Sequence, residues 1–218
     1  QWMRFAQGEQ WHNNTAYQAW TADFEETDTF YLYPSELDAL KALNLSPSQS
    51  VIRDLFFIGV YTGLAFAEFT SIRPDMISTE AGRKVITITR GKTQKRLKIP
   101  ILKELDAILA KYGYTSPQVT NQHLNDGLKV MAREAEKDTS GGIVKYSPRP
   151  LHSVIASHCA RRTFATLFYL IGVDVKKISA LLGHTTEKQT REYIGADFME
   201  MAEQFADDVT RKTNLEFA

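Results

Sequence analysis

The stretch SHCARRTFATLFYLIGVDVKKISALLGHTTEKQTREYIG (157–195) decides the fold of this 218-residue chain. Its first part is a predicted helix that Gly172 ends, since glycine is the residue that most often follows a helix. Asp174 is a good N-cap for VKKISALL, which Gly183 closes. A further short helix is predicted from Thr186 to Tyr193. The stretch therefore predicts three consecutive helices separated by sharp stops.

The sequence before this stretch is mostly helical, with one change of period. Helices are predicted over 34–44, 48–61, 64–72, 102–112 and 119–137. In between, KVITITR (84–90) and RLKIP (96–100) alternate and are β-branched, and a short link with a glycine joins them, which is typical of a β-hairpin. The expected fold class is mainly α with one small antiparallel β-sheet (α+β).

The two ends of the chain differ from its middle. Residues 1–25 are polar, acidic and dotted with tryptophan, and the opening QWMRF indicates a piece of something longer. The main domain is expected over 26–196. The tail, 197–218, is predicted to be an amphipathic helix with one apolar stripe, made by Phe198, Met201, Phe205 and Val209. That stripe can pack on its own domain or on a neighbouring subunit, and both alternatives stay open.

Composition excludes several classes of protein. Apolar residues make up 43% and charged residues 24%, as in folded globular chains. The longest nearly uncharged apolar stretch, 55–67, is shorter than the roughly 20 residues that cross a bilayer, so no transmembrane segment is expected. The single cysteine, Cys159, excludes an internal disulfide, suits a reducing compartment and is expected to fill the core. No paired ligand spacing predicts a metal site.

Charge is distributed unevenly along the chain. Its 26 basic and 26 acidic residues give zero formal charge. Yet residues 83–103 hold eight Lys or Arg and no acid, and 143–173 hold four more with two His and no acid, while acids gather near both ends. Such a chain can present one basic face to a polyanion while the whole molecule stays neutral.

Four features with chemical potential occur in one order. They are Lys92 in the hairpin link, the pair His158 and Arg161 at a spacing of three, His184 after a glycine, and Tyr193 nine residues later. Each is weak by itself, because such residues are more often surface, capping or packing groups. Their joint order and spacing carry the information.

In these residues the sequence resembles the tyrosine recombinase, or phage integrase, family of DNA breaking and rejoining enzymes. The resemblance runs from about Leu32 to Ile194 and is densest in 157–195, which holds TFAT and LLGH. YTGLAFAEFTSIRPDMI is similar to the family's TGLR-x-x-E segment, and GKTQKRLKIPI to its hairpin with the catalytic lysine. The resemblance implies the catalytic-domain fold of tyrosine recombinases.

The resemblance also implies a role for each residue. Tyr193 would attack a backbone phosphorus and form a 3′-phosphotyrosine, which conserves the bond energy, so that no cofactor, ATP or metal is needed. Arg161 would bind the non-bridging oxygens as a fork, and Lys92 would protonate the leaving 5′-oxygen. His158 would act as acid or base around the tyrosine proton, and His184 would hydrogen-bond the phosphate.

One position departs from the family. An arginine normally follows TGL, and here Ala65 stands in its place, although Glu68 matches. Losing one preorganised donor typically costs about 10² to 10³ in rate. Either the chain is an engineered Arg-to-Ala variant that binds DNA without cutting, or it is a natural variant in which another basic group, such as Arg73 or Arg53, reaches the phosphate.

The resemblance implies site-specific recombination for a phage or mobile element, on double-stranded DNA at specific sites, by a homo-oligomer that is a tetramer at synapsis. Residues 1–25 would end a separate core-binding domain, and the protein would be cytoplasmic and nucleoid-associated. The alternative is a catalytically dead DNA-binding regulator on the same fold. The expected DNA contacts are Lys95, Arg96, Lys98, Arg149 and Arg162.

Overall fold

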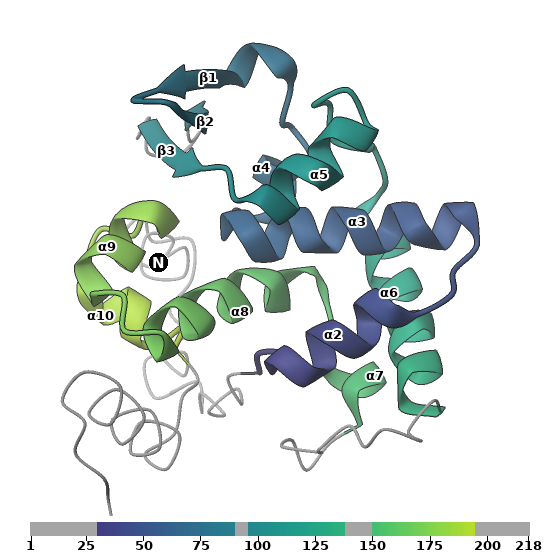
Figure 1. The fold of residues 1–218 in the computed structure, drawn as a ribbon. Helices are drawn as coiled ribbons and strands as arrows, with labels where there is room; N and C mark the ends of the chain where they lie inside the picture. The colour runs from purple at the N-terminus through teal and green to yellow at the C-terminus, as the bar shows by residue number, and fades with distance from the viewer. Residues whose placement is uncertain (1–29, 90–95, 138–149, 195–218) are drawn as a thin grey trace, which may run out of the picture.

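The computed structural model of the chain describes residues 30–89, 96–137 and 150–194 (Figure 1). The elements within these ranges are α2 (Pro34–Ala42), α3 (Pro47–Thr62), α4 (Phe66–Phe69), η2 (Pro74–Met76), β1 (Ile77–Glu80), β2 (Arg83–Thr89), β3 (Arg96–Pro100), α5 (Lys103–Lys111), α6 (Asn121–Lys137), α7 (Leu151–Val154), α8 (Ser157–Leu170), α9 (Val175–Leu182) and α10 (Glu187–Arg191). The prediction of a mainly α fold with a small antiparallel sheet is confirmed. The expectations for 1–25 and for the tail lie outside the described residues.

The central element is α3, which packs against α8, α6 and α5 (Figure 1). Ser46 caps its start, since its hydroxyl accepts from the Gln49 amide. Its end is Gly63, in the left-handed conformation at φ 64°. A Cβ on Gly59 would lie 3.0 Å from the Cβ of Ala160 on α8, so a side chain there would force the two helices apart.

The sheet has three strands in the order β1-β2-β3, all antiparallel. The predicted hairpin corresponds to β2 and β3, where Ile86 pairs with Ile99 and both are buried. β1 is an addition that the sequence pattern did not predict. It contains one apolar residue, Ile77, and three exposed polar ones, so it lacks the alternation that marks a half-buried strand.

Two helices also differ from the expectation. α4 covers only Phe66–Phe69 of the predicted 64–72, because Thr70 and Ser71 turn their hydroxyls onto the backbone carbonyls of Phe66 and Glu68. α7 was not predicted, since four residues carry too little periodicity. In the described ranges, no helix combines the length and apolar character that crossing a membrane requires.

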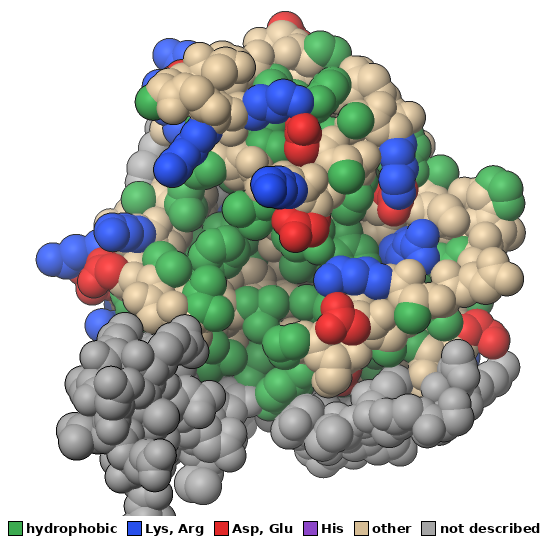
Figure 2. All heavy atoms as spheres, viewed as in Figure 1, with side chains coloured by type: hydrophobic (Ala, Val, Ile, Leu, Met, Phe, Trp, Pro, Cys, Tyr) green, Lys and Arg blue, Asp and Glu red, His purple; other side chains and the backbone are tan. Residues whose placement is uncertain are grey.

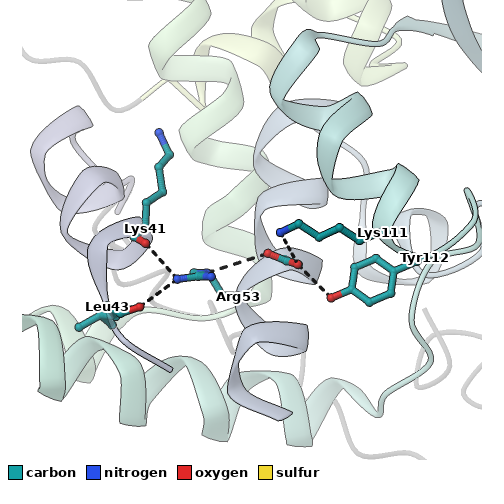
Figure 3. Close-up of polar contacts among 6 residues, drawn as sticks. Lys41, Leu43, Arg53, Lys111 and Tyr112 are labelled. Atoms are coloured by element: carbon teal, nitrogen blue, oxygen red, sulfur yellow. Dashed lines mark hydrogen bonds and ion pairs between the residues drawn. The ribbon is translucent and has the colours of Figure 1, made fainter. Parts of the chain in front are cut away.

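A polar cluster ties α2, α3 and α5 together (Figure 3). The Arg53 guanidinium donates to the carbonyls of Lys41 and Leu43, at 2.9 and 3.1 Å. Next to it, the buried carboxylate of Asp54 accepts from Lys111 Nζ at 3.1 Å and from the Tyr112 hydroxyl at 2.9 Å. The buried charge is therefore compensated, which it must be to remain in the core.

Two apolar clusters of unequal size hold the described residues together. The larger joins α2, α3, the sheet, α5, α6 and the first turn of α8. The smaller lies between α8 and α9 and consists of Phe164, Ala165, Ile178 and Leu182. Tyr193 and Ile194, which follow α10, pack against the smaller cluster.

Apolar side chains also gather in a hollow on one face of the molecule (Figure 2). A cavity of about 240 Å³ lies there between α2, α3 and α8. Its apolar lining includes Leu37, Val60, Phe164, Leu167 and Phe168.

Candidate functional site

Arg161 joins the ends of two helices to α8. Its side chain is buried, with a relative exposure of 7%. Nη1 donates to the carbonyl of Gly63 at 2.7 Å, and Nη2 donates to the carbonyl of Leu182 at 2.6 Å. Those carbonyls lie at the C-terminal ends of α3 and α9, where the helix dipole is negative, so a guanidinium is stabilised there. The geometry fixes the orientation of Arg161 before any ligand arrives.

Tyr193 lies beside two guanidinium groups. Its ring centroid is 5.7 Å from Cζ of Arg161 and 5.6 Å from Cζ of Arg162, which is within reach of a cation–π contact. Its amide donates to the carbonyl of Thr190 at 3.0 Å, which continues the last turn of α10. The tyrosine is half-buried, so its ring is held by packing and is not wholly enclosed.

His184 lies next to Tyr193, on the turn that follows α9. It follows Gly183, which ends α9 in the left-handed conformation at φ 66°. The His184 amide donates to the carbonyl of Ser179 at 3.0 Å, so the chain turns sharply back. The imidazole centroid lies 5.0 Å from that of Tyr193, and Nδ1 is 2.9 Å from Oγ1 of Thr190. The structure thus brings Arg161, Arg162, His184 and Tyr193 to one place.

His158 lies on the first turn of α8, three residues and nearly one turn before Arg161. The residue as a whole is exposed, but its Nε2 is 3.9 Å from the sulfur of buried Cys159. Partial burial, helped by the positive charge of Arg162, lowers the pKa of His158 below its ordinary value of 6.5. A neutral imidazole at pH 7 can accept a proton.

Cys159 lies beside His158, but its thiol is not a reactive group. Burial raises the pKa of its thiol to about 11, so the sulfur is protonated at neutral pH and is a poor nucleophile. Its full burial agrees with the expectation of a core-filling role.

Ala65 lies two residues beyond the Gly63 carbonyl that Arg161 contacts. It is exposed, precedes α4, and its amide donates to Oε2 of Glu68 at 2.9 Å. Arg53 is not placed to replace an arginine here. It lies about 15 Å along α3 from Gly63, and the carbonyls of Lys41 and Leu43 hold its guanidinium there. Arg73 is exposed and pairs with Asp75 at 3.3 Å.

The predicted DNA contacts fall into three groups. Arg162 lies at the tyrosine ring, as described above. Arg96 is exposed at the start of β3 and lines an open cavity of about 600 Å³ with Glu68 and Ser71. Lys98 forms a surface ion pair with Glu80 at 2.7 Å. The other two predicted DNA contacts, Lys95 and Arg149, lie outside the described ranges, and so does Lys92, the predicted catalytic lysine.

Two features of the site were not predicted from the sequence. The carbonyls that hold Arg161 carry no sequence signal, because every residue has one. Thr190 is fully buried and lies within the polar run EKQTRE, where only its position three before Tyr193 could have drawn attention. No group of three or more potential metal ligands comes together in the described ranges.

The sequence pattern of the phage integrase family matches residues 31–200. Tyrosine recombinase XerC of Brucella suis biovar 1 (strain 1330) is 29% identical over 152 residues, which are 66% of this chain and 45% of that protein. This chain therefore spans less than half the length of that curated relative.

Solved structures share the fold at low identity. A lambda integrase (75-356) dimer bound to a COC′ core site has a TM-score of 0.67 and 18% identity, over 90% of this chain and 69% of that one. The XerH recombinase bound to palindromic difH has a TM-score of 0.62 and 17% identity, over 85% and 55%. The Tn1549 transposon integrase with circular intermediate DNA has 0.60 and 15%, over 88% and 69%. With the match over 31–200, the chain belongs to the phage integrase family of tyrosine recombinases.

Proposed function

We propose that this chain carries the strand-transfer site of a site-specific DNA recombinase, with Tyr193 as the nucleophile. The observation that supports this proposal is the gathering of Arg161, Arg162 and His184 around the ring of Tyr193. A phenol can attack a phosphodiester, and guanidiniums and an imidazole can stabilise the charge that develops on the phosphate oxygens.

In the proposed reaction, the phenolic oxygen of Tyr193 forms a bond to a backbone phosphorus as the bond to the 5′-oxygen breaks. The phenolic proton passes to a base, for which His158 is the candidate, and the leaving oxygen takes a proton from Lys92. Arg161 stabilises the non-bridging oxygens. Its hydrogen bonds to two carbonyls hold the guanidinium in place, so that it need not reorient during the reaction. The phosphotyrosine that forms keeps the energy needed for resealing.

Ala65 makes this chain an impaired enzyme in the proposal. A methyl group donates no hydrogen bond, so the missing donor is expected to slow cleavage about 10² to 10³-fold. The same residue favours the second candidate, a DNA-binding regulator that has lost catalysis.

A duplex with a nick beside the scissile phosphate tests the proposal, because the nick traps the covalent product. The Ala65→Arg variant should form a covalent protein–DNA adduct about 10² to 10³ times faster than the parent chain. The double variant with Tyr193→Phe should form none. Adduct that persists without the phenol would refute the assignment of Tyr193. Tight binding without adduct, even in Ala65→Arg, would favour the regulator.

The proposal extends to the assembly. The partner would be duplex DNA at specific recombination sites of a phage or mobile element, and the active form a homo-oligomer of four subunits. The apolar stripe of the tail, 197–218, would be lent to a neighbouring subunit, and the apolar hollow of Figure 2 offers the chemistry that such a stripe requires. Deleting 197–218 should abolish assembly on DNA and spare monomer folding. Unchanged assembly would refute the exchange.

A further inference from the structure

Thr190 contacts both His184 and Tyr193, and neither the sequence nor the proposed reaction accounts for it. Its side chain is fully buried, at 0% relative exposure. Oγ1 lies 2.9 Å from Nδ1 of His184. Its carbonyl accepts the amides of Tyr193 at 3.0 Å and of Ile194 at 3.1 Å. One residue thus connects the imidazole to the turn that presents the phenol.

The two nitrogens of an imidazole take different roles, and the partner of one fixes the proton on the other. With Nδ1 directed at a buried hydroxyl, contact with a phosphate falls to Nε2, on the other side of the ring. A phosphate oxygen accepts hydrogen bonds, so Nε2 must carry the proton. In the neutral ring Nδ1 is then an acceptor, and the Thr190 hydroxyl is the donor that satisfies it.

We propose that Thr190 is a positioning residue of the strand-transfer site. Its hydroxyl donates to Nδ1 of His184 and holds the ring in the Nε2–H tautomer, while its carbonyl fixes the turn before Tyr193. The proposal rests on the proposed function for its catalytic consequence, but its effect on the imidazole can be measured without DNA.

The first measurement is ¹⁵N NMR of the His184 ring in the full chain at a pH where the ring is neutral. The shifts of the two ring nitrogens report the tautomer. Thr190→Val removes the hydroxyl and keeps the shape, and should turn a predominant Nε2–H form into a mixture. Thr190→Ser keeps a donor and should restore the parent pattern. The matched control is Thr70→Val, which removes a hydroxyl that donates to the Phe66 carbonyl of α4. An unchanged pattern in Thr190→Val overturns the proposal.

The second measurement is adduct formation on the nicked duplex in the Ala65→Arg background. Thr190→Val should lower the rate roughly tenfold, the worth of one hydrogen bond, and Thr190→Ser and Thr70→Val should stay within about twofold. If Ala65→Arg itself forms no adduct, the proposed function fails, and the NMR result still decides whether Thr190 sets the tautomer. If adduct forms at equal rates with Val and Thr at this position, the positioning role is refuted. Circular dichroism of each variant confirms that the helices are intact.

Discussion

Replacing Arg161 should destabilise the whole fold, apart from any effect on catalysis. The guanidinium is buried and makes two short hydrogen bonds, at 2.7 and 2.6 Å, to carbonyls of two different helices. A hydrogen bond to a charged group contributes about 1.5 to 3 kcal/mol. Arg161→Ala loses both and leaves two helix-end carbonyls without their donor, so the free energy of unfolding should fall by about 3 to 5 kcal/mol. Arg161→Lys can keep one bond and should lose about half as much.

Urea unfolding followed by circular dichroism measures these changes. Arg191→Ala is the matched control, because that side chain is 61% exposed and its ion pair with Glu187 is 3.9 Å long. The control should change the unfolding free energy by less than about 0.5 kcal/mol. A loss below about 1 kcal/mol in Arg161→Ala would refute the structural role and leave only the proposed catalytic one.

Three further predictions follow from single contacts. Gly63→Ala should lower the unfolding free energy by about 2 to 4 kcal/mol in urea titrations, because the position has φ +64° and a Cβ would lie 2.6 Å from Phe164 Cδ1; a neutral result contradicts this. Burial, helped by a neighbouring carboxylate, raises the pKa of Tyr112 to about 12 from 10, so the folded state holds this proton more tightly than the unfolded state. The stabilisation that Tyr112 contributes is complete below pH 10 and is lost between about pH 10 and 12. The free energy of unfolding of Tyr112→Phe should therefore fall less steeply with pH over that window; equal slopes in the two chains contradict the prediction. The pKa of His158, measured by ¹H NMR titration, should lie below 6.5 and rise in Arg162→Gln, since the variant removes a neighbouring positive charge; the same value in both chains would exclude that electrostatic effect.

Much of the fold could be predicted because its boundaries are encoded locally. The cap at Asp174 and the stop at Gly183 were expected and are present, since both depend on the chemistry of one residue. β1 was missed because its residues are mostly exposed, and its pairing with β2 is a tertiary event that leaves no periodicity in the sequence. Capping and turn residues therefore make the helix ends predictable from the sequence, whereas the edge strand β1 is not.

The sequence pattern indicated candidate site residues by type and order, but it could not show how their side chains are held. Spacing alone cannot place Arg162 at the ring of Tyr193, because adjacent positions on a helix point in directions about 100° apart. The main-chain carbonyls around Arg161 depend on where α3 and α9 end in space. The roles of the site residues, and of the missing arginine at Ala65, remain predictions for the adduct assay.

The smaller apolar cluster has a consequence for the local stability around Tyr193. Tyr193 packs against the cluster of Phe164, Ala165, Ile178 and Leu182, and not against the larger core around α3. A unit with few buried side chains opens at a lower free energy than the global fold does. The segment that carries Tyr193 is therefore expected to open before the larger core does. Amide hydrogen exchange should show α10 opening well before α3.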